Sequence, residues 1–183
     1  MNRILYVLVL FLLIGCSKGI EPVNKNANQK TKQLLNYLSG LQHNKNDKLI
    51  SGIRGLRFEG NGAVTGAEGI YNATGQWVGL IGQEYCKNYG DVEFDTADEA
   101  VIWEEKNPDF IEHSQNGGII RILAHFPNPG NERYGGLRDS SANIDAIVTE
   151  GTTDRKRWLD LLDEVAEGLH DLDNHGISAI YGP

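Results

Sequence analysis

The feature that most constrains the fold is an apolar run, residues 117–129, which opens on two glycines and contains two prolines near its end. Its isoleucine and leucine side chains do not alternate with polar ones, which is typical of a strand buried on both faces of a parallel sheet. Pro127 and Pro129 cannot donate to a strand ladder, so the strand must end before them. His125 and Asn128 are therefore expected at the carboxyl end of a buried strand, where α/β folds bind ligands. A structural histidine in a capped loop is the alternative.

Other short apolar segments alternate with helical patterns along the chain. Strands are predicted at residues 48–52, 77–82 and 177–181, and helices at residues 31–41, 63–72, 96–103, 109–114 and 158–172, with a break at Asn107-Pro108. This order is that of a parallel α/β sheet, and right-handed crossovers wind such a sheet as a (β/α)₈ barrel winds. A complete barrel takes roughly 250 residues, so this chain accounts for about the first four β/α units. The long connection at 130–151 is expected to form one wall of a cleft or to be disordered.

The N-terminus has the form of an export signal. Arg3 gives a positive start, residues 4–14 are an almost unbroken apolar run, and Gly15-Cys16 follows. The run is too short for an ordinary membrane span, and a small residue before cysteine resembles a bacterial lipobox. That resemblance implies a lipoprotein signal peptide at 1–15, lipid on Cys16, a tether at 16–29 and a folded domain at 30–183. We expect an exported protein held to a bacterial membrane, and a general secretory signal is the alternative.

Charge and composition limit the ligands. The formal net charge of −8 argues against a nucleic-acid partner, which would require a basic face. If Cys16 carries lipid, Cys86 is alone and no intramolecular disulfide can form. The sequence shows no phosphate-binding loop, dinucleotide fingerprint or zinc-ligand cluster, so we expect no cofactor and no metal.

Four segments in register resemble glycoside hydrolase family 26, the β-mannanase family. They are a Leu-Leu-Asn-Tyr-Leu helix with the strand at 48–52, residues 74–82 followed by Glu84 and Tyr85, the 117–129 run, and the helix from Trp158 into residues 176–177. The resemblance covers Thr31 to the C-terminus. It implies a retaining (β/α)₈ glycosidase fold, of which this chain is the N-terminal half.

The resemblance also implies a substrate and a mechanism. Family members use one glutamate as nucleophile and a second as acid/base, the latter after the fourth strand in an Arg-Pro-x-His-Glu type motif. Gly182 stands where that arginine is expected, and both catalytic glutamates lie beyond residue 183. The chain therefore resembles a truncated endo-β-1,4-mannanase that is inactive alone, with β-mannan or a related β-glycan as ligand.

The residues that can be carried over are those of the first half of the cleft. His125 matches a sugar-binding histidine, and Glu84, Tyr85 and Asn128 match the strand ends beside it. Glu84 could accept from sugar hydroxyls or instead cap a turn, and Tyr85 could stack on a sugar. The three tryptophans are expected to pack in the core. Two alternatives stay open, a non-catalytic surface glycan-binding lipoprotein and an unrelated parallel α/β lipoprotein.

Overall fold

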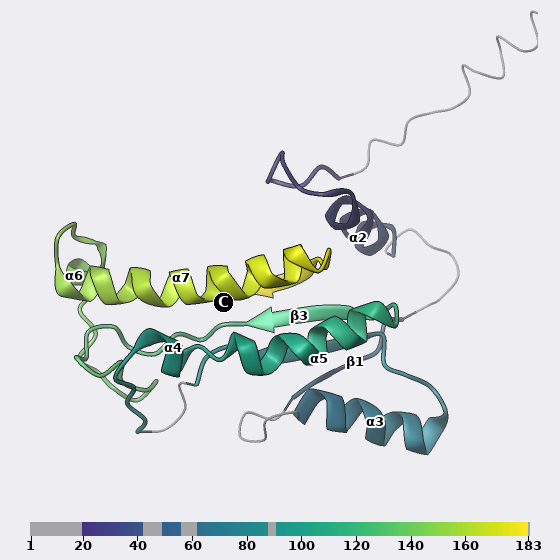
Figure 1. Ribbon diagram of the computed structural model, residues 1–183, viewed down its shortest axis with the longest axis horizontal. Coiled ribbons are helices and arrows are strands. Elements are labelled where there is room, and N and C mark those ends of the chain that lie inside the picture. The colour runs from purple at the N-terminus through teal and green to yellow at the C-terminus, as the bar shows by residue number, and fades with distance from the viewer. Residues whose placement is uncertain (1–19, 42–48, 56–61, 88–90, 183) are drawn as a thin grey trace, which may run out of the picture. The chain divides into compact units, whose positions relative to one another are not determined.

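The computed structural model describes residues 20–41, 49–55, 62–87 and 91–182 (Figure 1). The chain divides into two compact units, residues 1–47 and 48–183, which are described separately. The predicted signal peptide and Cys16 lie outside the described residues. Within the described ranges, no helix combines the length and apolar character needed to cross a membrane.

The first unit contains one described helix, α2 (Gln29–Gly40). It begins two residues before the predicted start at Thr31, because the Asn28 side chain caps the helix by accepting a hydrogen bond from the Thr31 backbone N–H at 2.8 Å. Leu34, Leu35 and Leu38 recur at helical spacing and are half-buried. Residues 20–28, part of the predicted tether, contain no helix or strand.

The second unit is built on a parallel sheet, as predicted. The strands described are β1 (Gly52–Arg54), β2 (Leu80–Glu84), β3 (Ile119–Leu123) and β4 (Ala179–Gly182), in the spatial order β1-β2-β3-β4. All three pairings are parallel. Each strand therefore lies beside the next one in the chain, which is the order that a (β/α)₈ barrel requires.

The first two strands are displaced from their predicted positions. β1 begins at Gly52, the last residue of the predicted strand, and β2 begins three residues after Trp77. The glycines of the first segment favoured a loop, but Ile53 packs against the core and fixes the strand there. Before β2, the Ser51 carbonyl accepts hydrogen bonds from the N–H groups of Gly79 and Leu80, so the ladder starts later than the apolar pattern does.

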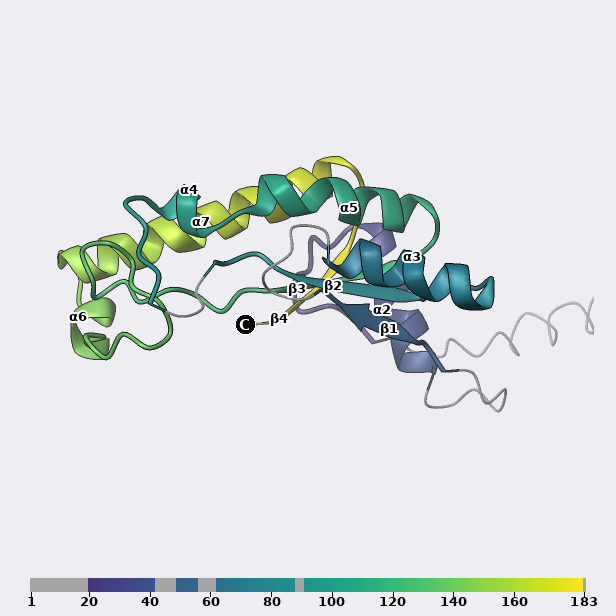
Figure 2. The same cartoon turned by 90° about the horizontal axis from the view of Figure 1, so that it is seen from below.

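Helices cover one face of the sheet: α3 (Gly62–Thr74), α5 (Trp103–Gln115) and α7 (Thr153–Asn174) lie on the same side of the strands (Figure 2). The predicted break at Asn107-Pro108 is wrong, because α5 continues through Pro108. The chain breaks earlier, between the short α4 (Ala97–Ala100) and α5, where the Ile102 N–H donates to the Tyr85 carbonyl. α7 ends as predicted, with Gly176 in the left-handed region at φ 66°.

The core lies between this helical layer and the sheet. Its fully buried members include Ile81, Ile120, Ile122, Phe110 and Leu161. Alternation along the strands points Leu80, Gly82, Arg121 and Leu123 to the opposite face, where they line a groove of about 310 Å³.

The tryptophans divide differently from the prediction. Trp103 and Trp158 pack against the core, as predicted. Trp77 does not, because its side chain is 56% exposed and stacks on Tyr71 instead.

Candidate functional site

The candidate site is a charged cluster at the carboxyl ends of β1, β2 and β3. Glu84, the last residue of β2, pairs in register with Leu123, the last residue of β3. Its neighbour Gln83 faces the helices and donates to Asp109 of α5 at 3.1 Å. Because side chains alternate along a strand, Glu84 points to the face opposite the helices. His125, two residues after Leu123, extends from β3 onto the same face.

One carboxylate holds both the backbone and the side chain of His125. Glu84 Oε1 accepts a hydrogen bond from the His125 backbone N–H at 2.7 Å, and Oε2 lies 2.7 Å from Nδ1 of the imidazole. Arg54, at the end of β1, donates from Nη2 to Oε2 at 3.1 Å. The side chains of Glu84, His125 and Arg54 are 9%, 35% and 44% exposed. The carboxylate is thus the inner member of the cluster, and the imidazole and guanidinium are accessible to a ligand.

This arrangement determines what His125 can offer. A carboxylate only accepts, so the imidazole must carry its proton on Nδ1 to make the contact. In the neutral ring Nε2 is then an acceptor, and in the described part of the chain it has no hydrogen-bond partner. A ligand hydroxyl can donate to this atom. Glu84 therefore fixes the orientation of His125, and its three hydrogen bonds go to His125 and Arg54 instead of to the turn after β2. Its predicted role as an acceptor for sugar hydroxyls stays a prediction.

Tyr85 does not belong to the site, and its predicted stacking role is wrong. It follows Glu84 directly, so it points to the helical face, where its ring is fully buried against Phe110. Its hydroxyl donates to Asn107 Oδ1, and Asn107 in turn donates to the Gly168 carbonyl at 2.9 Å and to Asp171 at 2.7 Å. Burial raises the pKa of the Tyr85 hydroxyl. The residue joins β2 to α5 and α7.

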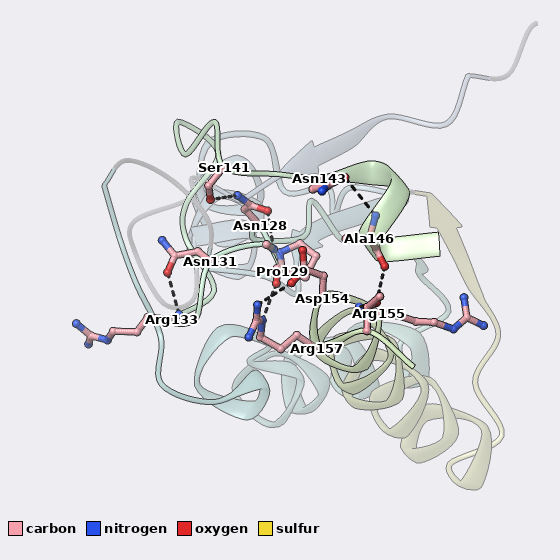
Figure 3. Close-up of polar contacts among 12 residues, drawn as sticks. Asn128, Pro129, Asn131, Arg133, Ser141, Asn143, Ala146, Asp154, Arg155 and Arg157 are labelled. Atoms are coloured by element: carbon pink, nitrogen blue, oxygen red, sulfur yellow. Dashed lines mark hydrogen bonds and ion pairs between the residues drawn. The ribbon is translucent and has the colours of Figure 1, made fainter. Parts of the chain in front are cut away.

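Asn128 organises the loop after β3 (Figure 3). Its Oδ1 accepts from the Gly130 N–H at 2.8 Å, its amide donates to Ser141 Oγ at 3.0 Å, and its backbone N–H donates to the Gly135 carbonyl at 2.6 Å. The structure therefore brings His125 and Glu84 together, while the Asn128 side chain is bonded within its own loop.

The connection from 126 to 151, which follows His125, is held by many hydrogen bonds. It contains the short helix α6 (Ile144–Val148) and is tied to α7 by Arg157, whose Nε donates to the Pro129 carbonyl at 2.6 Å (Figure 3). Inside it, Asp139 accepts from the Asn131 amide at 2.7 Å and from the Ser141 N–H at 2.8 Å. These bonds lower the pKa of Asp139 to about 2. The loop predicted at 130–151 is thus structured and not disordered, and its role as a cleft wall stays a prediction.

Sequence reasoning missed Arg54. The displaced prediction for β1 put it in a glycine-rich loop, although it ends a strand as Glu84 does. The signal in the sequence is that β1 ends in arginine and the next strand, β2, ends in glutamate, which predicts an ion pair at the shared edge of the sheet. Elsewhere, within the described ranges, no three His, Cys, Asp or Glu side chains gather as metal ligands would.

Comparison with known proteins places the chain in a family. The family model "Glycosyl hydrolase family 26" matches residues 23–183. A mannan endo-1,4-beta-mannosidase of Bacillus subtilis (strain 168) is 30% identical over 97% of this chain and 50% of its own length. Mannan endo-1,4-beta-mannosidase A and B of Caldalkalibacillus mannanilyticus is 31% identical over 91% of this chain and 32% of its own length. The chain therefore spans half or less of these curated relatives.

Solved structures agree. A Bacillus subtilis mannanase superposes with a TM-score of 0.78 at 28% identity, covering 89% of this chain and 48% of that one. A beta-mannanase from a symbiotic protist of the termite Reticulitermes speratus, solved in complex with gluco-manno-oligosaccharide, has the same fold, with a TM-score of 0.70 at 21% identity over 88% of this chain and 50% of that one. The strand order, the helical layer and these matches show a parallel sheet corresponding to about half of a (β/α)₈ barrel. The chain belongs to glycosyl hydrolase family 26.

Proposed function

We propose that residues 49–182 form the sugar-binding first half of the substrate cleft of an endo-β-1,4-mannanase, with β-mannan or a related β-glycan as ligand. One observation carries the proposal: Glu84 fixes His125 through both the backbone N–H and Nδ1 at the carboxyl edge of the sheet. Ligands of (β/α)₈ barrels bind at that edge. The family and the names of the relatives, mannan endo-1,4-beta-mannosidases, support this choice of ligand.

The cluster suits a neutral ligand rich in hydroxyl groups. His125 Nε2 accepts from one sugar hydroxyl, and its orientation is held by a carboxylate that has little exposed surface. Arg54 donates from Nη2 to Glu84 and its side chain is 44% exposed, so its other N–H groups can donate to sugar oxygens. Glu84 is a positioning residue, because its two oxygens already accept three hydrogen bonds.

The proposed reaction is a double displacement that retains the anomeric configuration. It requires two carboxyl groups about 5–5.5 Å apart, one to form the glycosyl-enzyme bond and one to protonate and then deprotonate. The strands described end in Arg54, Glu84, Leu123 and Gly182, and Glu84 is engaged by its two basic neighbours. We therefore assign both catalytic glutamates to chain outside residues 1–183, and expect these residues alone to bind glycan without cleaving it.

Isothermal titration of the purified chain with mannopentaose tests the binding. His125→Ala should weaken binding at least tenfold, since a positioned hydrogen-bonding group and its orientation are both lost. Glu84→Gln keeps the shape but removes the charge, and should weaken binding several-fold. Glu132→Gln, at an exposed position outside the cluster, is the matched control and should bind as the unaltered chain does. Equal affinity of the His125→Ala variant would refute the cleft, and release of reducing sugar by the chain would refute the assignment of the catalytic pair.

We also propose that the protein is exported and held to a bacterial membrane by lipid on Cys16. Arg3, the apolar residues 4–14 and Gly15-Cys16 support this. When expressed in a bacterium, the protein should partition into a detergent phase, and Cys16→Ser should move it to the aqueous phase. Aqueous partition of the unaltered protein would contradict the lipid anchor.

A further inference from the structure

A second hollow lies away from the cleft, between α3 and α5. It has a volume of about 320 Å³, at the small end of the range for small-molecule sites. Two facing helical stripes line it, together with the residues that precede β2 and β3. Helix α3 contributes Val64, Ala67 and Glu68, and α5 contributes Asp109, Glu112 and His113, with its C-cap residue Asn116. The amino ends of the strands border it, so it lies at the edge of the sheet opposite Glu84 and His125.

An exposed aromatic pair borders this pocket. Trp77 lines it and is 56% exposed. Tyr71, one helical turn beyond Glu68 on α3, is 41% exposed and stacks on Trp77, with ring centroids 4.5 Å apart and planes inclined by 15°. Neither ring packs in the core, although burial is the ordinary fate of such side chains. Because the two rings are stacked face to face, Tyr71 covers one face of Trp77 and fixes its ring, which leaves the other face of Trp77 as a flat apolar surface beside a polar hollow.

The charges around the pocket limit what it can hold. Its lining has three carboxylates, Glu68, Asp109 and Glu112, and no lysine or arginine. His113 does not supply a positive charge, because burial lowers its pKa and its Nε2 is packed against Gly118. An anionic ligand would therefore be repelled. Glu68 and Glu112 are exposed acceptors, well suited to ligand groups that donate hydrogen bonds.

From this combination we propose a second glycan-binding site, in which the outer face of Trp77, fixed from behind by Tyr71, stacks on the apolar face of a pyranose ring and the acidic rim accepts from its hydroxyls. The choice of sugar rests on the proposed function, which makes β-mannan the polymer that this protein meets. A compact cation is the competing ligand, because an aromatic face beside carboxylates also attracts positive charge, and the Glu112→Gln variant below separates the two. This site would bind one part of a glycan polymer at the amino ends of the strands, while the cleft at their carboxyl ends binds another part of the same polymer.

Affinity electrophoresis in gels containing a soluble galactomannan tests the site. Trp77→Ala should weaken the retardation about tenfold, as expected for loss of an aromatic anchor, and Trp77→Phe should keep most of it. Tyr37→Ala removes a similarly exposed aromatic, 52% exposed, from α2 and should change nothing. Glu112→Gln should have little effect, because an amide oxygen still accepts from hydroxyls. A large loss in that variant would indicate a cationic ligand and overturn the proposal.

A direct measurement separates this site from the cleft. In the His125→Ala variant, mannohexaose should still shield tryptophan fluorescence from acrylamide quenching, and the additional Trp77→Ala change should abolish the shielding. If Trp77→Ala binds galactomannan as well as the unaltered chain while His125→Ala does not, the second site is refuted and the cleft stands. If only Trp77→Ala loses binding, the second site stands and the cleft is refuted. No binding by any variant refutes both.

Discussion

Asn107 is expected to be one of the most sensitive positions in the protein. Its side chain is almost fully buried in α5 and connects three elements: it accepts from the Tyr85 hydroxyl at the end of β2 and donates to Gly168 and Asp171 of α7. We consider Asn107→Leu, which keeps the approximate volume but removes every hydrogen bond. The substitution leaves the Tyr85 hydroxyl without a partner inside the core.

The expected cost follows from the three bonds. An orphaned buried hydroxyl costs about 1–3 kcal/mol, and each lost bond roughly 0.5–1.5 kcal/mol, the bond to the Asp171 carboxylate being counted on the same scale because that carboxylate is partly exposed. The two donated bonds count near the lower limit, because the Gly168 carbonyl keeps its helical partner and the partly exposed Asp171 regains water. The total is about 3 kcal/mol, a large share of the 5–15 kcal/mol that stabilises a typical domain. Tyr85→Phe removes the orphaned hydroxyl, so the double variant should recover about 2 kcal/mol of the sum of the two single changes.

Urea unfolding followed by circular dichroism measures these differences. Asn72→Leu, at an exposed position of α3, is the control and should lie within about 0.5 kcal/mol of the unaltered protein. If Asn107→Leu is equally harmless, or if its effect adds to that of Tyr85→Phe without coupling, the buried network does not hold the elements together as argued.

Three further predictions follow from single positions. Gly168→Ala should destabilise the folded protein by about 1–3 kcal/mol despite the higher helix propensity of alanine, because the new Cβ would lie 2.6 Å from Trp103 Cβ. Gly69→Ala in α3 meets nothing within 4 Å and should stabilise the fold by about 0.5–1 kcal/mol. Equal effects of the two changes in urea unfolding would contradict this. The pKa of Asp139 is lowered from 3.8 to about 2. Its contribution to the free energy of unfolding is therefore complete above pH 3.8 and is lost as the pH falls through 2. An NMR titration of this carboxyl group with a midpoint near 3.8 would show that the loop hydrogen bonds are absent in solution. Burial raises the pKa of Cys86, so a Cys16→Ser variant should not react with a thiol reagent at pH 8 until it is denatured, and rapid labelling of the folded protein would exclude the buried position.

The fold was largely predictable because its signals are local. The apolar run at β3, the long amphipathic α7 and its Gly176 cap each lie where their patterns indicate. The errors lie where tertiary contacts overrule the local signal. Pro108 is tolerated inside α5 because buried Asn107 and Phe110 anchor the helix on both sides of it, and β1 was misplaced because its three residues owe their strand conformation to pairing with β2.

The site was only partly predictable, because sequence gives a residue's position in a strand but not its partners. His125 was found from its place after a buried strand, and Glu84 from its place at the end of another. The register that sets Glu84 beside Leu123 makes the carboxylate a support for His125, and alternation then directs Tyr85 into the core. Arg54 could be recognised only after β1 was correctly placed, and the apolar strand pattern that begins at Trp77 does not indicate that its side chain is exposed.

The linear strand order has a consequence for how a closed barrel can be assembled. β1 and β4 stand at opposite edges of the sheet, and in the described part of the chain each pairs with a strand on one side only. A separately synthesised second half of a barrel could thus pair with β1 on one side and with β4 on the other, at two seams, without any change in the partners of β2 or β3. Both seams would be made by the shortest of the described strands, of three and four residues, so their few backbone hydrogen bonds would govern whether two pieces close into one barrel.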